Sequence, residues 1–108
     1  MRPDVAAFIA SKKTSDVQQK AMIQFAQALQ GALEAEVSDP QAVASSARAI
    51  TRGVGCIWRQ FSASEAPDIV TAIRSRTMNT KERVLAYERY AHALSGSVLR
   101  RPGGNPCD

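Results

Sequence analysis

Apolar side chains recur three and four residues apart along most of this chain, and this spacing constrains the fold more than any other feature. It places apolar residues on one face of a helix. Alternating β-branched runs and Asn-Gly or Asp-Gly hairpin turns, which signal strands, do not occur in the sequence. The clearest case lies between residues 17 and 33, with Val17, Ala21, Phe25, Ala28, Leu29, Ala32 and Leu33. We therefore predict an all-α fold.

Helix-starting residues divide the first half of the chain into three helices. A short helix is expected over residues 4–12. Thr14, Ser15 and Asp16 offer N-caps for a second helix that reaches about residue 37. Asp39 can cap a third helix over residues 40–61, and Pro40 suits its first turn.

Two capping-box pairs predict the remaining helices. Ser62 with Glu65 starts a fourth helix that ends near residue 76, and Asn79 with Glu82 starts a fifth that ends near residue 99. The prediction is a compact bundle of four main helices plus a short N-terminal helix. Residues 1–99 form its single domain. Residues 100–108 hold two prolines and two glycines and are expected to be a flexible tail.

The predicted third helix carries a stripe of arginines. Arg48, Arg52 and Arg59 lie opposite its apolar face, and no acidic residue occurs between positions 41 and 61. The stripe can dock on phosphates or carboxylates. The alternative, which we favour, is a solvated face that contributes little. The opposite, apolar face holds Val43, Ala47, Ile50, Val54, Ile57 and Phe61, with Trp58 at its edge.

Two glycines interrupt the same helix. A glycine inside a helix costs about 1 kcal/mol relative to alanine, so Gly53 and Gly55 need a reason. They do not form a phosphate loop, because the Gly-x-Gly-x-x-Gly spacing and a preceding strand are missing. Gly55 lies within the arginine stripe, where it leaves room for a partner to approach. A kink is the alternative, and the one we favour.

The two cysteines predict neither a disulfide framework nor a metal site. Cys56 and Cys107 have no Cys-x-x-Cys or ligand spacing, which indicates two free thiols in a reducing cytoplasm. Cys56 is expected to be a small core or boundary residue, because a thiol nucleophile needs a base and nothing places His92 beside it. The sequence also lacks an apolar run long enough for a membrane span.

The predicted fifth helix has two apolar rows. Its main face holds Val84, Tyr87, Ala91, Leu94 and Val98. Leu85, His92 and Leu99 form a second row at a spacing of seven. This row is either buried or an exposed seam for a dimer or partner. Glu88 lies one turn before His92, so we expect a structural histidine paired with that carboxylate.

Basic residues are concentrated in the second part of the chain. Residues 41–108 hold ten of the fourteen basic residues and five of the ten acidic ones, and the whole chain carries a formal charge of +4. This imbalance is compatible with an acidic partner or a polyanion. However, Tyr87 and Tyr90 are expected in the core or at its edge, so they do not form a stacking platform for bases.

The sequence shows no set of side chains spaced as in a catalytic site, and we expect neither enzymatic activity nor a cofactor or metal. The sequence favours a cytoplasmic, non-enzymatic protein-interaction module that associates with itself or joins a complex. The alternative is a nucleic-acid-binding accessory protein that uses the arginine stripe. The predicted partner-binding residues are Arg48, Arg52, Gly55, Arg59, Leu85, His92 and Leu99.

Overall fold

The computed structural model describes residues 2–95 and 103–108 and confirms the all-α prediction. It contains a short N-terminal helix and four longer ones, and the described ranges hold no strand. None of the helices in these ranges is both long enough and apolar enough to cross a lipid bilayer. The helices are α1 (Pro3–Ser11), α2 (Asp16–Glu34), α3 (Pro40–Gln60), α4 (Ala66–Thr77) and α5 (Lys81–Leu94).

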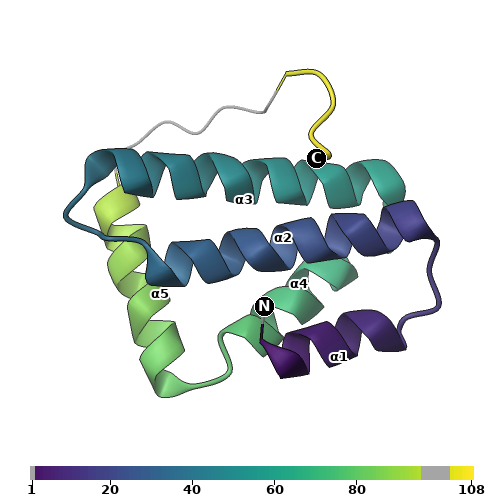
Figure 1. Ribbon diagram of the computed structural model, residues 1–108, viewed down its shortest axis with the longest axis horizontal. Helices are drawn as coiled ribbons and strands as arrows, with labels where there is room; N and C mark the ends of the chain where they lie inside the picture. The colour runs from purple at the N-terminus through teal and green to yellow at the C-terminus, as the bar shows by residue number, and fades with distance from the viewer. Residues whose placement is uncertain (1, 96–102) are drawn as a thin grey trace.

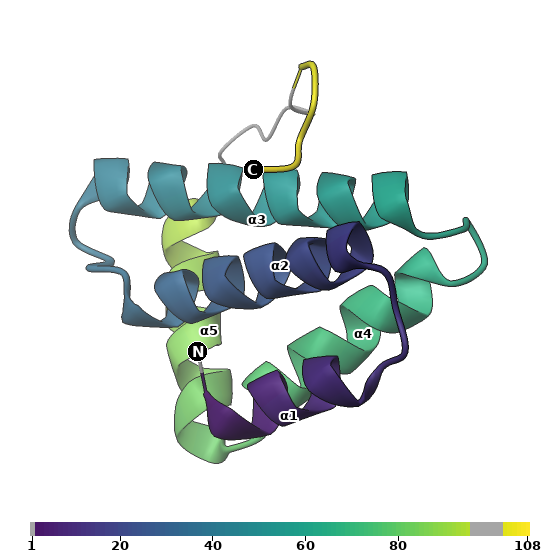
Figure 2. The same cartoon turned by 45° about the vertical axis from the view of Figure 1, so that its right-hand side comes forward.

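Helix α2 lies at the centre and contacts each of the other four helices. Helices α2 and α3 run antiparallel, side by side (Figures 1 and 2). Helix α5 crosses both near the end where the α2–α3 loop lies, and α1 and α4 cover the lower side of α2 in these views. The outer face of α3, above α2 in Figure 1, is left free of other helices.

Most predicted helix starts are confirmed. Ser15 forms a capping box with Gln18, and the Asp39 carboxylate accepts hydrogen bonds from the first backbone N–H groups of α3. The predicted Asn79 cap is wrong. The Thr80 hydroxyl caps α5 by accepting from the backbone N–H of Arg83, because the Asn79 side chain is instead bonded to side chains of α1 and α5.

Two helices end earlier than predicted. Helix α2 ends at Glu34 rather than near residue 37, and α5 ends at Leu94 rather than near residue 99. Ser95, the C-cap of α5, has an extended ψ of 133°. It is followed in the sequence by Gly96, and both residue types have a weak helix preference. Ser62 does bond to Glu65 as predicted, but the regular helix α4 begins at Ala66 with Glu65 as its N-cap, three residues later than a helix capped by Ser62 would begin.

The core is built mainly from α2, with contributions from every other helix. Phe25, Met22 and Leu29 are fully buried, and Ile57 and Ile73 reach them from α3 and α4. Val17, predicted to lie on the apolar face of α2, is 53% exposed because it sits in the first turn, beyond the region that the other helices cover.

A second cluster joins α5 to the far end of α2 and α3. Tyr90 is buried there with Ala32 and Val43, and its ring lies 5.8 Å from that of Tyr87. The predicted core position of Tyr90 is thus confirmed. Its burial, together with the neighbouring Tyr87, raises the pKa of the Tyr90 phenol to about 12.

Several arginines are used to hold the helices together. The Arg76 guanidinium lies 3.9 Å from the centre of the Phe8 ring and so joins α4 to α1. Arg2 donates to the backbone carbonyl of Thr77 and pairs with Asp4 at 3.0 Å. These cations are therefore part of the fold, in addition to their contribution to the surface charge.

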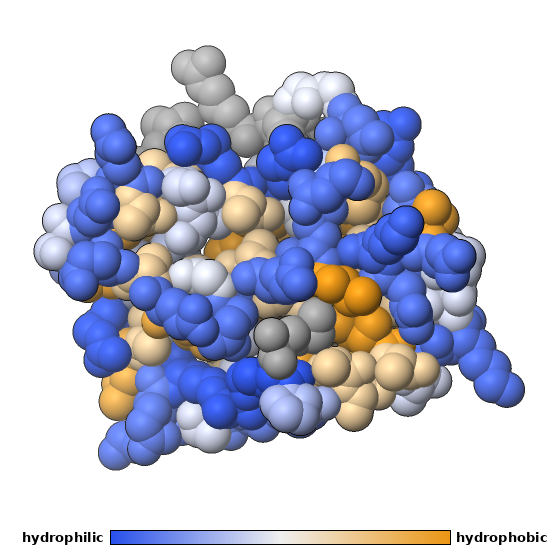
Figure 3. Space-filling view, viewed as in Figure 1, coloured by the Kyte–Doolittle hydropathy of each residue, from blue (hydrophilic) through white to orange (hydrophobic). Residues whose placement is uncertain are grey.

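Hydrophilic side chains cover most of the face seen in Figure 1 (Figure 3). Hydrophobic residues on this face gather mainly on its right-hand side, where α1 and α2 lie. The large exposed hydrophobic residues are Val17, Val37, Trp58, Val84 and Leu85. Trp58 is the largest of them, and it belongs to α3.

Candidate interaction surface

The predicted arginine stripe exists, but part of it is covered by the end of the chain. Arg48, Arg52 and Arg59 are all exposed on α3. The Arg52 guanidinium pairs with the side-chain carboxylate of Asp108 at 3.4 Å. Residues 41–61 contain no acidic side chain, but Asp108 places one carboxylate beside this stretch and so partly neutralises the arginine stripe.

A disulfide brings the end of the chain to this position. Cys56 and Cys107 are bonded to each other across 51 residues of sequence. The prediction of two free thiols is wrong, because it depended on the sequence spacing and not on the fold. Cys56 lies on α3 and is buried as expected, although its partner is another cysteine. A thiol nucleophile at Cys56 is not available in this disulfide-bonded form.

Residues 103–108, which we call the C-terminal segment, lie against α2 and α3. The side-chain amide of Gln24 donates to the carbonyl of Pro106 at 2.9 Å and accepts from the backbone N–H of Asp108 at 3.0 Å. Pro106 is buried. This differs from the flexible tail that we predicted for residues 100–108, of which residues 100–102 lie outside the described ranges.

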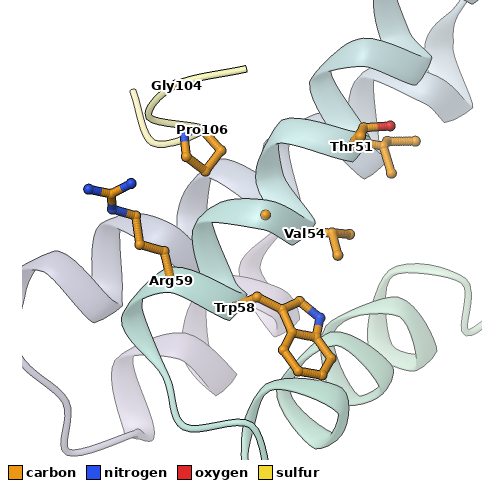
Figure 4. A pocket seen from close by; sticks show the side chains of 8 residues that line it. Thr51, Val54, Trp58, Arg59, Gly104 and Pro106 are labelled. Atoms are coloured by element: carbon orange, nitrogen blue, oxygen red, sulfur yellow. The ribbon is translucent and has the colours of Figure 1, made fainter. Parts of the chain in front are cut away.

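Gly55 lies in a hollow between α3 and the C-terminal segment (Figure 4). The hollow has a volume of about 690 Å³, and we call it the Trp58 groove. Val54 and Trp58 point to one side of α3, and Arg59 points to the other, where Pro106 lies. The groove is lined by Ile50, Thr51, Val54, Gly55, Trp58, Arg59, Gly104 and Pro106. The space that we expected beside Gly55 is thus an open hollow with the chain's own C-terminal segment on one side.

Among the groove residues, Trp58 is the one whose exposure differs most from the prediction. It was expected at the edge of the core, and its side chain is 47% exposed. Ile50 and Val54, predicted to be core residues, are only partly buried. The groove therefore combines an exposed indole with aliphatic side chains and with one guanidinium, that of Arg59.

Helix α3 is continuous from Pro40 to Gln60 and runs without a visible sharp bend in Figures 1 and 2, which does not support the expected kink. Gly53 has another role. It is buried against α2, and a Cβ atom at this position would lie 2.9 Å from the Cα atom of Phe25. The glycine is thus required by the close approach of two helix backbones.

The predicted second row of α5 is exposed where the structure describes it. Leu85 is 42% exposed, and His92 is also exposed. Leu99 lies outside the described residues. The predicted structural pairing of His92 with Glu88 is wrong, because His92 is on the surface and no hydrogen bond or ion pair joins the two in the described part of the chain. A shallow hollow beside this row is lined by Val37, Leu85, Glu88, Arg89, His92 and Ala93.

The described residues also contain no group of three or more histidine, cysteine or acidic side chains that could hold a metal ion. Searches with this chain against models of protein families, curated proteins and solved structures found no match.

Proposed function

We propose that the protein is a non-enzymatic interaction module and that it binds a protein partner through the Trp58 groove. The observation that carries this proposal is the 47% exposure of Trp58, the chain's only tryptophan, beside an open groove. Tryptophan and arginine are enriched among the residues that dominate binding energy at protein interfaces. Trp58 and Arg59 supply one of each at this site.

The charge of this surface favours an acidic partner segment. Arg59 lines the groove, and Arg48 continues the stripe further along α3. A peptide helix with apolar side chains for Trp58 and Val54 and a carboxylate for Arg59 would match both properties. A second copy of the chain fits this face less well, because it would bring like charges together.

Selection of binding peptides from a random library would test the proposal. We expect the selected peptides to combine apolar and acidic residues, and to bind with a blue shift of Trp58 emission as the indole leaves water. Arg59→Glu should weaken binding by about tenfold or more, the loss of a charge-assisted contact. Lys81→Glu, the same charge change at an exposed position of α5 that lines neither hollow, is the matched control and should have little effect.

Peptides that bind Trp58→Ala as tightly as the natural chain would overturn the proposed site. The proposed site is also overturned if the selected peptides are not enriched in acidic residues and Arg59→Glu does not change their affinity. Both variants change exposed side chains, so the fold should be retained. A far-UV circular dichroism spectrum of each variant checks this.

Self-association is a second proposal, supported by a different surface. Val84 and Leu85 are 43% and 42% exposed on α5, and the hollow beside Leu85 carries both an acid, Glu88, and a base, Arg89. Two copies related by a twofold axis could pair these opposite charges. Light scattering over a range of concentrations should then show a dimer that Leu85→Lys dissociates, whereas a monomer at high concentration contradicts the proposal.

Nucleic-acid binding through the stripe is the less favoured proposal. Arg52 is paired with Asp108, and Arg74 and Arg76 lie over aromatic rings of the fold. Fewer cations therefore remain for phosphates than the sequence suggested. A mobility shift with duplex and single-stranded probes should be weak and lost steeply with salt. A strong shift that Arg48→Gln removes would instead favour this function over peptide binding.

The disulfide also bears on where the protein works. The expected cytoplasmic location depended on two free thiols, and disulfides are rare in reducing compartments. We propose that the protein encounters oxidising conditions while it functions. Rapid alkylation of thiols in the native host should leave Cys56 and Cys107 unmodified until a reductant is added. Modification of both cysteines before reduction would contradict this.

A further inference from the structure

The C-terminal segment is held on α2 and α3 by one covalent bond and a small number of weak contacts. The ion pair between Arg52 and Asp108 joins side chains that are 44% and 76% exposed, so it contributes little in water. Gln60 makes a long contact of 3.7 Å with the sulfur of Cys107. Gln24 provides the two good hydrogen bonds. The disulfide is therefore the main attachment.

Three surface hollows border this segment and are separated by it. The Trp58 groove ends at Gly104 and Pro106. A hollow of about 260 Å³ on the α2 side includes Cys107 and Asp108, and one of about 420 Å³ near Arg48 also ends at Asp108. The segment thus forms part of the wall of each hollow, so its removal would open all three.

We propose that the Cys56–Cys107 disulfide is a redox switch that controls access to the hollows bordered by the C-terminal segment, the Trp58 groove among them. The reductant would be a dithiol. Its thiolate attacks the sulfur of Cys107, which is partly exposed, and the thiolate of Cys56, which is 2% exposed, is the leaving group. The second thiol of the reductant then displaces Cys107 from the mixed disulfide. Two electrons and two protons pass to the protein, which gains two thiols, and the reductant becomes a disulfide.

The structural part of this proposal does not depend on any partner. After reduction, the segment keeps the contacts with Gln24, Gln60 and Arg52 and the burial of Pro106, but no covalent bond then opposes the conformational entropy that it gains by detaching. Gly103 and Gly104 add freedom at its start, and Gly104 already has a positive φ of 68°. We therefore expect residues 105–108 to detach while the five helices stay folded.

Measurement of ¹⁵N backbone relaxation on the whole chain tests this step. In the oxidised protein the order parameters of Cys107 and Asp108 should be close to those of the helices, about 0.85, and after addition of dithiothreitol they should fall below about 0.6. Cys107→Ser should behave like the reduced protein, and Gln24→Ala should remain ordered when oxidised. Unchanged order in the reduced protein overturns the switch. Unfolding of all five helices on reduction also overturns it, since the disulfide would then be a structural staple.

The regulatory part rests on the proposed function of the Trp58 groove. A peptide selected on the oxidised protein should change its affinity by about fivefold or more when the protein is reduced, since allosteric couplings are commonly of that size. If the segment detaches but the affinity does not change, the regulatory part is wrong. If no selected peptide binds through Trp58 in either redox state, the proposed function is wrong. The relaxation experiment then still tests whether reduction detaches the C-terminal segment.

Discussion

Gly53 of α3 lies directly against Phe25 of α2, so closely that a Cβ atom on the glycine would be 2.9 Å from the Phe25 Cα atom. Backbone cannot yield to a methyl group as a flexible side chain can. Helices α2 and α3 are the two longest helices of the fold and run antiparallel (Figure 1), and α3 also carries most of the residues of the Trp58 groove. The position of the Trp58 groove thus depends on a glycine that is not part of it.

Replacement of Gly53 by alanine should therefore destabilise the protein. We expect a loss of about 1–3 kcal/mol in the free energy of unfolding, because the methyl group must push the two helices apart. Gly31→Ala is the matched control. Gly31 is exposed on α2 and has no atom within 4 Å of an added Cβ, so alanine there should stabilise by up to about 1 kcal/mol. Urea unfolding of both variants measures the difference, and equal effects would contradict the close approach.

The disulfide should stabilise the protein through the unfolded chain. Cross-linking residues 51 positions apart reduces the freedom of the unfolded state, which is typically worth about 2–4 kcal/mol. Cys56→Ser combined with Cys107→Ser should lower the free energy of unfolding by that amount. Urea unfolding with and without reductant checks the result. Addition of reductant should affect the natural chain and leave the double variant unchanged; an equal effect on both would mean that the reductant acts elsewhere.

The stability should fall at alkaline pH because of Tyr90. Its pKa is about 12 in the folded protein, compared with an ordinary value of 10.0, so the folded state favours the neutral phenol. This stabilisation is complete below pH 10 and is lost as the pH rises through 12, by up to about 3 kcal/mol. Thermal unfolding between pH 9 and 12 should show the fall, and Tyr90→Phe should make it smaller. A natural chain whose stability is unchanged over this range would contradict the burial of the phenol.

The start of α5 can be tested by a pair of variants at one position. Thr80→Ala removes the hydroxyl that accepts from the backbone N–H of Arg83, and should cost about 1 kcal/mol. Thr80→Ser keeps a hydroxyl and should cost less. Urea unfolding distinguishes the two, and equal losses would mean that the hydroxyl does not cap the helix.

The helices could be predicted because their signals are local. The spacing of Ala21, Phe25 and Leu29 and the caps at Ser15 and Asp39 act within a few residues, so the sequence contains all the information that they need. The cap of α5 was placed at Asn79 instead of Thr80 because both residue types are good caps. The choice between them is made by Asp4 and Arg2, which bond to Asn79 from the other end of the chain.

The candidate site could be predicted only in part, since it depends on long-range contacts. The arginine stripe and the open position at Gly55 follow from the helical periodicity alone. The C-terminal segment borders that position, and no local pattern places Cys107 beside Cys56 or Pro106 beside Gln24.

The same bond changes the covalent topology of the molecule. It closes residues 56–107 into a ring that includes the end of α3 and the whole of α4 and α5, while α1, α2 and the first part of α3 form a linear arm outside it. A protease cut anywhere inside the ring opens it without releasing a fragment, whereas a cut in the arm separates the chain into two pieces. A single proteolytic cut therefore leaves the second half of the fold covalently connected but detaches part of the first half.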